Sequence, residues 1–256
     1  MSGIIESLGW KVFERKTLLE SLDECLNEGC SPLFMPSIID MITLHNDRYR
    51  PPFRTYFSQS IRVTGKSEED GEPVVVYAHA PHYLSDPRNL ERAIKEGLVE
   101  GTVAYPEDEF QKLLELEEAN KKVIAVGYLK TSMGGHYRPH RHPEGKMFCG
   151  GKDRVNRFFR EYRDFDPNIA IPPAANIHDA DPPPPPKGPM ICLKDGLHER
   201  PLASFLAFVS DGTLLAGRLT NTGTIYDNTF RLIGIPGDPS DFDRIRAEIV
   251  QHYKGK

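Results

Sequence analysis

The chain has 256 residues, of which 32 are basic and 37 acidic, giving a net charge of −5 at neutral pH. Its length is sufficient for one large hydrophobic core, and its acidic balance disfavours nucleic acid as a partner. Hydrophobic residues make up 39% of the chain, yet no run approaches the roughly 20 apolar residues that cross a bilayer. Composition therefore predicts a soluble globular protein without a membrane span.

The N-terminal part of the chain alternates between helical and strand patterns. Leucines recur at helical spacing through residues 17–27, and Gly29 follows as a helix stop. Isoleucines after Pro36 predict a short second helix, and we interpret His45 as a core histidine. Residues 55–77 carry β-branched and aromatic side chains on both sides of a polar turn, which predicts a β-hairpin.

Two histidines, His79 and His82, follow the second strand of this hairpin. Catalytic groups are often found at the carboxyl end of a strand. A pair of hydrated loop histidines is the other interpretation, and the sequence leaves both open.

Three further helices and one further strand are predicted between this hairpin and the proline-rich segment. Asp86, an N-cap residue followed by proline, predicts a helix over residues 86–99. A helix over 106–119 has acidic residues in its first turn, and a helix over 152–164 carries an aromatic stripe. The apolar residues 122–129 predict a buried strand.

The last third of the chain begins with a segment that is unsuited to regular structure. Residues 166–189 are rich in proline and poor in large apolar side chains, which predicts an extended linker, with an SH3-type ligand as the alternative. Beyond it, residues 205–235 predict a β-meander that contains a tight turn at Asp211, and Asp238 opens a terminal helix.

These elements predict an α+β fold with a mixed, largely antiparallel sheet flanked by helices. We assign a main domain to residues 1–165 and a connecting segment to 166–190. The C-terminal meander and helix, 191–256, are expected to pack on the main domain, because about 65 residues are few for an independent unit.

Most of the chemically suggestive residues lie between 134 and 163. Basic residues outnumber acidic ones by eight to three in this stretch, a local charge of +5 on an acidic chain. Such an island attracts anions locally. Glycines and prolines forbid a continuous helix through its first part, so this part must be extended or looped, and if it is extended, alternate side chains point to one side. The side chains on that side are His136, Arg138, His140, His142 and Glu144.

A metal-assisted enzyme is the first function that this stretch suggests. His140 and His142, with His136 or Glu144 as a third ligand, form a donor set that suits a divalent zinc, iron or manganese ion. The spacing is similar to the first cupin motif, but too few residues separate His142 from Glu144, so we assign no family. Arg138 beside a cation would require an anion between them. The hypothesis is attack by a metal-bound water on a small phosphorylated or carboxylated substrate.

A non-catalytic anion-binding module is the second function that the stretch suggests. Gly150 and Gly151 precede a helix, so free amides and the helix dipole could hold a phosphate together with Lys152, Arg154 and Arg138. The P-loop pattern is missing, and a simple turn before a helix would also explain the glycines. The third class is a structural protein that forms homo-oligomers. No acid–base pair can be assigned.

Four cysteines, Cys25, Cys30, Cys149 and Cys192, are scattered without a Cys-x-x-Cys pair. This spacing is typical of reduced, buried thiols, and a zinc site using the first two would need ligands from elsewhere. Residues 1–10 contain no basic residue before their short apolar run, so we expect no secretory signal. The sequence therefore predicts a cytoplasmic protein.

Overall fold

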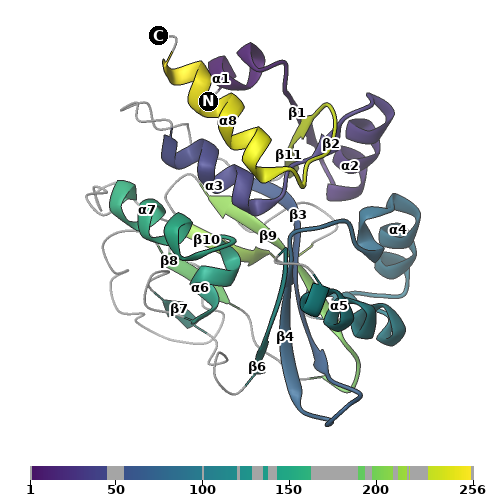
Figure 1. Cartoon of the computed structure of the whole chain (residues 1–256). Coiled ribbons are helices and arrows are strands. Elements are labelled where there is room, and N and C mark those ends of the chain that lie inside the picture. The colour runs from purple at the N-terminus through teal and green to yellow at the C-terminus, as the bar shows by residue number, and fades with distance from the viewer. Residues whose placement is uncertain are drawn as a thin grey trace, which may run out of the picture.

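Helices cover both faces of one large mixed sheet, as Figure 1 shows. The structure is a computed structural model, and it describes residues 2–44, 55–99, 101–119, 122–128, 135–137, 143–162, 190–193, 198–209, 213–217, 219 and 230–254. Within these ranges eleven strands join one sheet, which confirms the predicted α+β class. None of the helices in the described part of the chain is long and apolar enough to span a membrane.

Strand β3 (Thr55–Lys66) organises the sheet, because it has different neighbours along its two halves. β9 (Leu202–Val209) pairs antiparallel with one edge of β3, across an irregularity between Phe57 and Ile61. On the other edge, β11 (Phe230–Ile235) pairs parallel with the first half and β4 (Pro73–Ala78) pairs antiparallel with the second. The sheet therefore branches at residues 58–60 of β3.

The other strands extend this branched sheet from its edges. β1 (Lys11–Arg15) and β2 (Ser31–Pro32) pair with β11, β6 (Val123–Gly127) pairs with β4, β5 (Val103–Ala104) and β10 (Thr213–Gly217) pair with β9, and β8 (Met190–Leu193) lies between β10 and β7 (Gly135–Tyr137).

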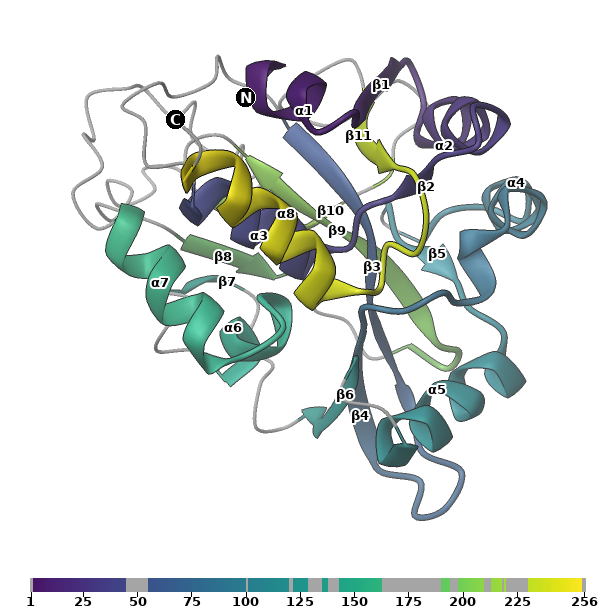
Figure 2. The same ribbon diagram turned by 45° about the horizontal axis from the view of Figure 1, so that its top comes forward.

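Side chains alternate along the strands and divide the core in two. In β4, Val75 and Tyr77 face one core and Val76 and Ala78 face the other. The turned view in Figure 2 shows the helices grouped along the sheet. The first core contains residues of α1 (Ser2–Ser7), α3 (Met35–Leu44), α6 (Pro143–Phe148), α7 (Lys152–Tyr162) and α8 (Phe242–Lys254), and the second contains residues of α2 (Leu18–Asn27), α4 (Pro87–Lys95) and α5 (Glu107–Ala119).

The predicted helices are confirmed, and local capping explains most of their limits. Thr17 and Glu20 form a reciprocal capping box at the start of α2, with N···O distances of 3.0 and 3.1 Å. Asp86 caps α4 as predicted, but α4 ends at Lys95, because Gly97 has a φ of +105° that ends the helical backbone. α3 begins before the expected position, since Pro36 is tolerated in its first turn.

The C-terminal strands differ from the predicted meander. β9 and β10 form the expected antiparallel hairpin, but β11 lies on the opposite edge of β3, where it pairs parallel. These strands are therefore central to the sheet. β6, predicted to be buried, is only half-buried at residues 124–126 and pairs with β4. The proline-rich residues 166–189 lie outside the described residues.

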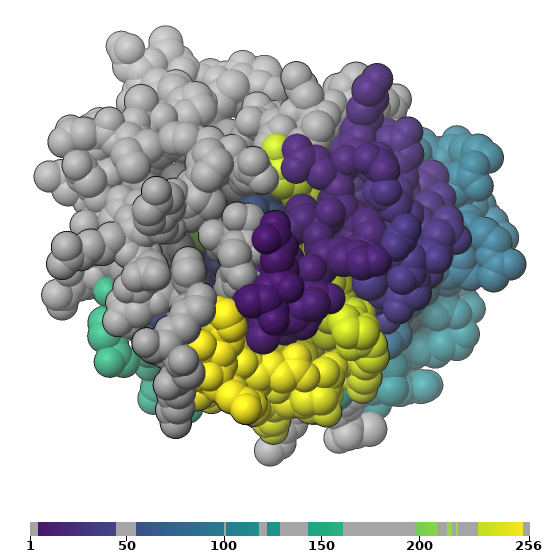
Figure 3. All heavy atoms as spheres, turned by 90° about the horizontal axis from the view of Figure 1, so that it is seen from above, coloured from purple at the N-terminus to yellow at the C-terminus, as the bar shows by residue number. Residues whose placement is uncertain are grey.

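The first and last helices meet at one end of the molecule. Seen from above in Figure 3, the N-terminal residues and α8 lie side by side. Ser7 Oγ lies 3.2 Å from His252 Nδ1. Ile5 of α1 and Ile249 of α8 are buried in the same core.

Candidate functional site

The central stretch contains a helix, α6, that the sequence analysis missed. Pro143 occupies its first position, as Pro87 does in α4, and Glu144 lies in its first turn, where α5 also has acidic residues. Glu144 therefore lies in a helix, and the interpretation in which an extended chain continues as far as Glu144 is wrong. His136 lies in β7, opposite Cys192 of β8.

Glu144 is part of a buried ion pair that attaches α6 to the sheet. Arg62 of β3 and Tyr77 of β4 lie directly opposite each other. Arg62 Nε donates to Glu144 Oε2 at 2.7 Å and its Nη2 donates to Oε1 at 3.2 Å, in bidentate geometry. The Tyr77 hydroxyl also donates to Oε2. The side chains of Arg62 and Glu144 are only 3% and 0% exposed, so the pair is formed away from water.

This environment decides the chemistry available to Tyr77 and Glu144. Burial raises the pKa of Tyr77 well above its usual value, and the charge of Glu144 raises it further. The phenol is therefore a hydrogen-bond donor that keeps its proton. Both oxygens of Glu144 are engaged by strand residues, so metal binding by this carboxylate would first require these contacts to break.

The two histidines after β4 form hydrogen bonds that hold neighbouring elements of the fold together. His79 is 1% exposed; its Nε2 lies 2.7 Å from the Met147 carbonyl and its Nδ1 lies 2.8 Å from Ser60 Oγ. A carbonyl only accepts, so Nε2 carries the proton and Nδ1 accepts one from Ser60. The Ser60 oxygen in turn accepts from the Met35 amide at 2.8 Å. His79 therefore joins β4 to β3 and α6 at the point where the sheet branches.

His82 makes a similar contact nearby. Its Nε2 lies 2.7 Å from the carbonyl of Gln59, in the branch of β3. Burial lowers the pKa of both His79 and His82 to about 4, so both rings are neutral at physiological pH. The hydrated-loop interpretation is therefore wrong for His79. The consecutive polar residues 58–60 within a strand pattern were a signal for this network.

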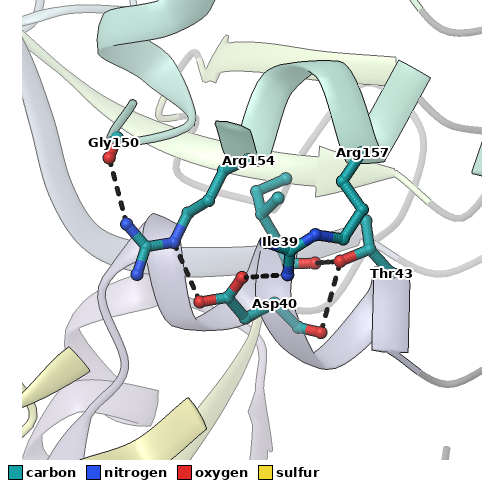
Figure 4. A network of polar contacts seen from close by, with 6 residues as sticks. All are labelled: Ile39, Asp40, Thr43, Gly150, Arg154 and Arg157. Carbon is teal, nitrogen blue, oxygen red and sulfur yellow. Dashed lines mark hydrogen bonds and ion pairs between the residues drawn. The ribbon is translucent and has the colours of Figure 1, made fainter. Parts of the chain in front are cut away.

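A second buried charge cluster attaches α7 to α3, as Figure 4 shows. Asp40 of α3 is 1% exposed, and both of its oxygens accept from arginines of α7. Arg154 Nε donates to Oδ2 at 2.8 Å, and Arg157 Nη1 donates to Oδ1 at 3.2 Å. Arg154 also lies over the ring of Phe242, 5.7 Å from its centroid, and so contacts α8. The cluster thus connects three helices.

The residues of the predicted anion site are largely engaged within the protein. The Gly150 carbonyl accepts from Arg154 at 3.0 Å, and the Gly150 and Gly151 amides donate to Met147 and Lys146 carbonyls of α6. Two of the amides expected to be free are therefore used to end α6. Lys152 is exposed at the start of α7.

The remaining predicted ligands are not placed by the structure. Arg138, His140 and His142 lie outside the described residues, so metal binding by the histidines stays a prediction. Among the residues that the structure does describe, no group of three or more histidine, cysteine, aspartate or glutamate side chains could hold a metal ion.

Comparison with known proteins gives an architectural likeness. No protein-family model and no curated protein matches the chain. A solved structure, described as "Accommodation of massive sequence variation in Nanoarchaeota by the C-type lectin fold", is similar at 28% identity and a TM-score of 0.66. The match covers 88% of this chain and 96% of that one, so the likeness extends over nearly the whole molecule.

Proposed function

We propose that this chain is a binding protein that recognises a small anionic ligand through residues 136–142 and performs no chemistry on it. One observation supports this most directly: secondary structure holds both ends of the basic stretch. β7 pairs with β8 at its beginning. α6 follows immediately, and the Glu144 carboxylate bound to Arg62 holds that helix on the sheet. The described residues on either side of 138–142 are therefore both attached to the sheet.

The charge of the stretch indicates the class of ligand. Arg138 and Arg141 supply permanent positive charge, and its three histidines add more below about pH 6.5, their ordinary pKa. The arginines of the adjacent helix contribute less, because Arg154 and Arg157 share the carboxylate of Asp40. We therefore expect a phosphate or carboxylate group to bind at 138–142.

The described contacts favour binding over catalysis. Glu144 and His79, the buried titratable groups closest in sequence or contact to the stretch, hold α6 in place. Neither is available as a general acid or base without disturbing that helix. The solved structure with similar architecture is described as accommodating massive sequence variation. For this chain we propose a comparable use, in which a constant buried scaffold presents residues that recognise a ligand.

Calorimetric titration with inorganic phosphate, pyrophosphate and citrate tests the proposal. We expect one of these anions to bind, and Arg138→Ala together with Arg141→Ala to weaken binding about tenfold or more for each arginine that contacts the ligand. Arg92→Ala is the matched control, because Arg92 is exposed on α4, which packs in the other core. Equal binding by the double variant, or none by the wild type, would refute the proposal.

The direction of the pH dependence separates this function from the metal-assisted enzyme. Protonated histidines strengthen anion binding as the pH falls toward about 6, whereas metal ligation requires neutral rings and weakens there. The metal alternative also expects bound zinc, iron or manganese that His140→Ala with His142→Ala removes. If no anion or metal binds, light scattering of the purified protein tests the third alternative, a homo-oligomeric structural protein. A cytoplasmic location is also proposed, supported by the free thiols of Cys25, Cys30 and Cys149.

A further inference from the structure

The carboxyl end of α2 brings two cysteines together. Gly29 has a φ of +69°, and the amides of Gly29 and Cys30 donate to the carbonyls of Leu26 and Cys25, both at 3.0 Å. These two hydrogen bonds define a Schellman motif, in which the residue after the glycine packs against the helix residue five positions earlier. In this chain those two residues are Cys30 and Cys25.

Strand β11 packs against the same pair and leaves little room around it. A Cβ atom at Gly234 would lie 2.6 Å from Cys25 Sγ and 3.0 Å from Cys30 Cβ, so both cysteine side chains reach one point above the strand. Phe13 Cε2 lies 2.6 Å from that same position. Only glycine fits here without displacing these neighbours, so the strand packs closely against the side chains of both cysteines.

The two thiols differ in access to solvent. Cys25 is 0% exposed and Cys30 is 7% exposed, with the exposed residues Glu28 and Gly29 beside it. The Cys30 thiol donates to the Glu28 carbonyl at 3.8 Å, at the surface end of the motif. Burial, with a smaller contribution from the neighbouring Cys30, raises the pKa of Cys25 to about 12. A reagent in solution therefore meets Cys30 first.

We propose that Cys25 and Cys30 form an oxidisable thiol pair that closes to an intramolecular disulfide when the folded protein meets a small disulfide such as glutathione disulfide. The Cys30 thiolate attacks one sulfur of glutathione disulfide, forming a mixed disulfide and releasing one glutathione thiolate. The Cys25 thiol then loses its proton, and its sulfur attacks Cys30 Sγ and releases the second glutathione. The protein loses two electrons and two protons, and glutathione disulfide is reduced to two glutathione molecules.

Peptide mapping of the oxidised wild-type protein tests the pair directly. The folded protein is incubated with glutathione disulfide, its remaining thiols are alkylated, and it is then denatured and cleaved after glutamate. Cleavage at Glu28 separates the two cysteines. We expect the fragments on either side of Glu28 to stay joined, with the mass of two hydrogen atoms lost and the join removed by reduction. Alkyl label on both cysteines, a persistent glutathione adduct on Cys30, or a bond from either to Cys149 or Cys192 would overturn the proposal.

Two variants test the order of the steps. Cys25→Ala removes the resolving thiol, so we expect Cys30 to accumulate as the glutathione adduct. Cys30→Ser removes the accessible thiol, so we expect Cys25 to stay unmodified over the same time. Circular dichroism establishes that each variant is folded before oxidation. If a variant does not fold, the wild-type map alone decides, because it needs no substitution.

Discussion

Glu144 is the single residue whose loss we expect to disturb the candidate site most. Removing one partner of a buried ion pair leaves the other charge uncompensated, which typically costs about 3–5 kcal/mol. We therefore predict that Glu144→Ala lowers the free energy of unfolding by about 3–5 kcal/mol in urea denaturation. Arg62 and Tyr77 would both lose the carboxylate to which they donate.

An exposed ion pair provides the matched control for this substitution. Glu91 pairs with Lys95 at 2.6 Å on the surface of α4. Such pairs contribute little, so Glu91→Ala should change the free energy of unfolding by less than about 1 kcal/mol. A second comparison is the double change Arg62→Met with Glu144→Leu, which removes both charges and should cost less than Glu144→Ala alone. A loss under about 1 kcal/mol for Glu144→Ala would show that the pair is not essential.

His79 should make the folded protein less stable as the pH falls. Its pKa in the folded protein is about 4, against the ordinary 6.5. The unfolded chain therefore binds a proton between these values while the folded protein does not. The contribution of His79 to the free energy of unfolding is therefore largest above about pH 6.5. It falls as the pH drops toward 4 and changes no further below that.

Replacing His79 by glutamine should weaken the pH dependence of stability. Between about pH 7 and about pH 5 the wild type should lose stability with a slope of up to about 1.4 kcal/mol per pH unit from this residue. The variant should lose less over the same interval, because glutamine can donate to the Met147 carbonyl without titrating. Urea denaturation at each pH measures both slopes. Equal slopes would mean that His79 does not carry the dependence.

The docking of α7 on α3 depends on one buried acid. Asp40→Ala should lower the free energy of unfolding by about 3–5 kcal/mol, because it removes the partner of both Arg154 and Arg157. The single changes Arg154→Ala and Arg157→Ala should each cost less, since each leaves Asp40 one arginine. Hydrogen exchange of Asp40→Ala should rise in α7 before it rises in β3. Uniform exchange across the molecule would contradict separate docking of this helix.

The helices could be predicted from the sequence because their caps are formed by neighbouring residues. Contacts between residues that are remote in sequence could not be predicted in this way. The caps of α2 and α4 are complete within a few neighbouring residues, so the sequence indicated both. α6 is short and has its signature after a run of prolines and histidines, which led to an extended interpretation of Glu144. The true partners of Glu144, Arg62 and Tyr77, are remote in sequence, and no periodic pattern indicates such a contact.

The topology of the sheet could not be predicted from the sequence for the same reason, because it depends on which strands pair with each other. The strand character of 205–209 and 230–235 was predicted, but the places of these strands on opposite edges of β3 were not. Both places depend on pairing between strands that are far apart in sequence, which the pattern within a single strand does not reveal. The basic stretch could be located from charge alone, whereas the engagement of Arg154 with Asp40 required the fold.

Removal of the C-terminal strands should therefore abolish folding of the entire chain. We predict that a fragment of residues 1–197 shows no cooperative unfolding transition, because it lacks β9 and β11, the neighbours of β3 on its two edges. Both cores would lose sheet residues in this fragment. Calorimetry and circular dichroism measure the transition, with the intact chain as control. A sharp transition in the fragment would indicate that residues 1–197 form an independent unit.

The position of β3 also has a consequence for how the protein is made. β3 is complete early in synthesis, but β9 and β11 are the last strands to leave the ribosome. At translation rates of about 5–20 residues per second, the apolar residues of β3 remain without these neighbours for roughly 7 to 34 seconds. During that interval the nascent chain exposes an unpaired strand edge to other molecules. Chaperones that bind exposed apolar segments would therefore protect the nascent chain from aggregation during that interval.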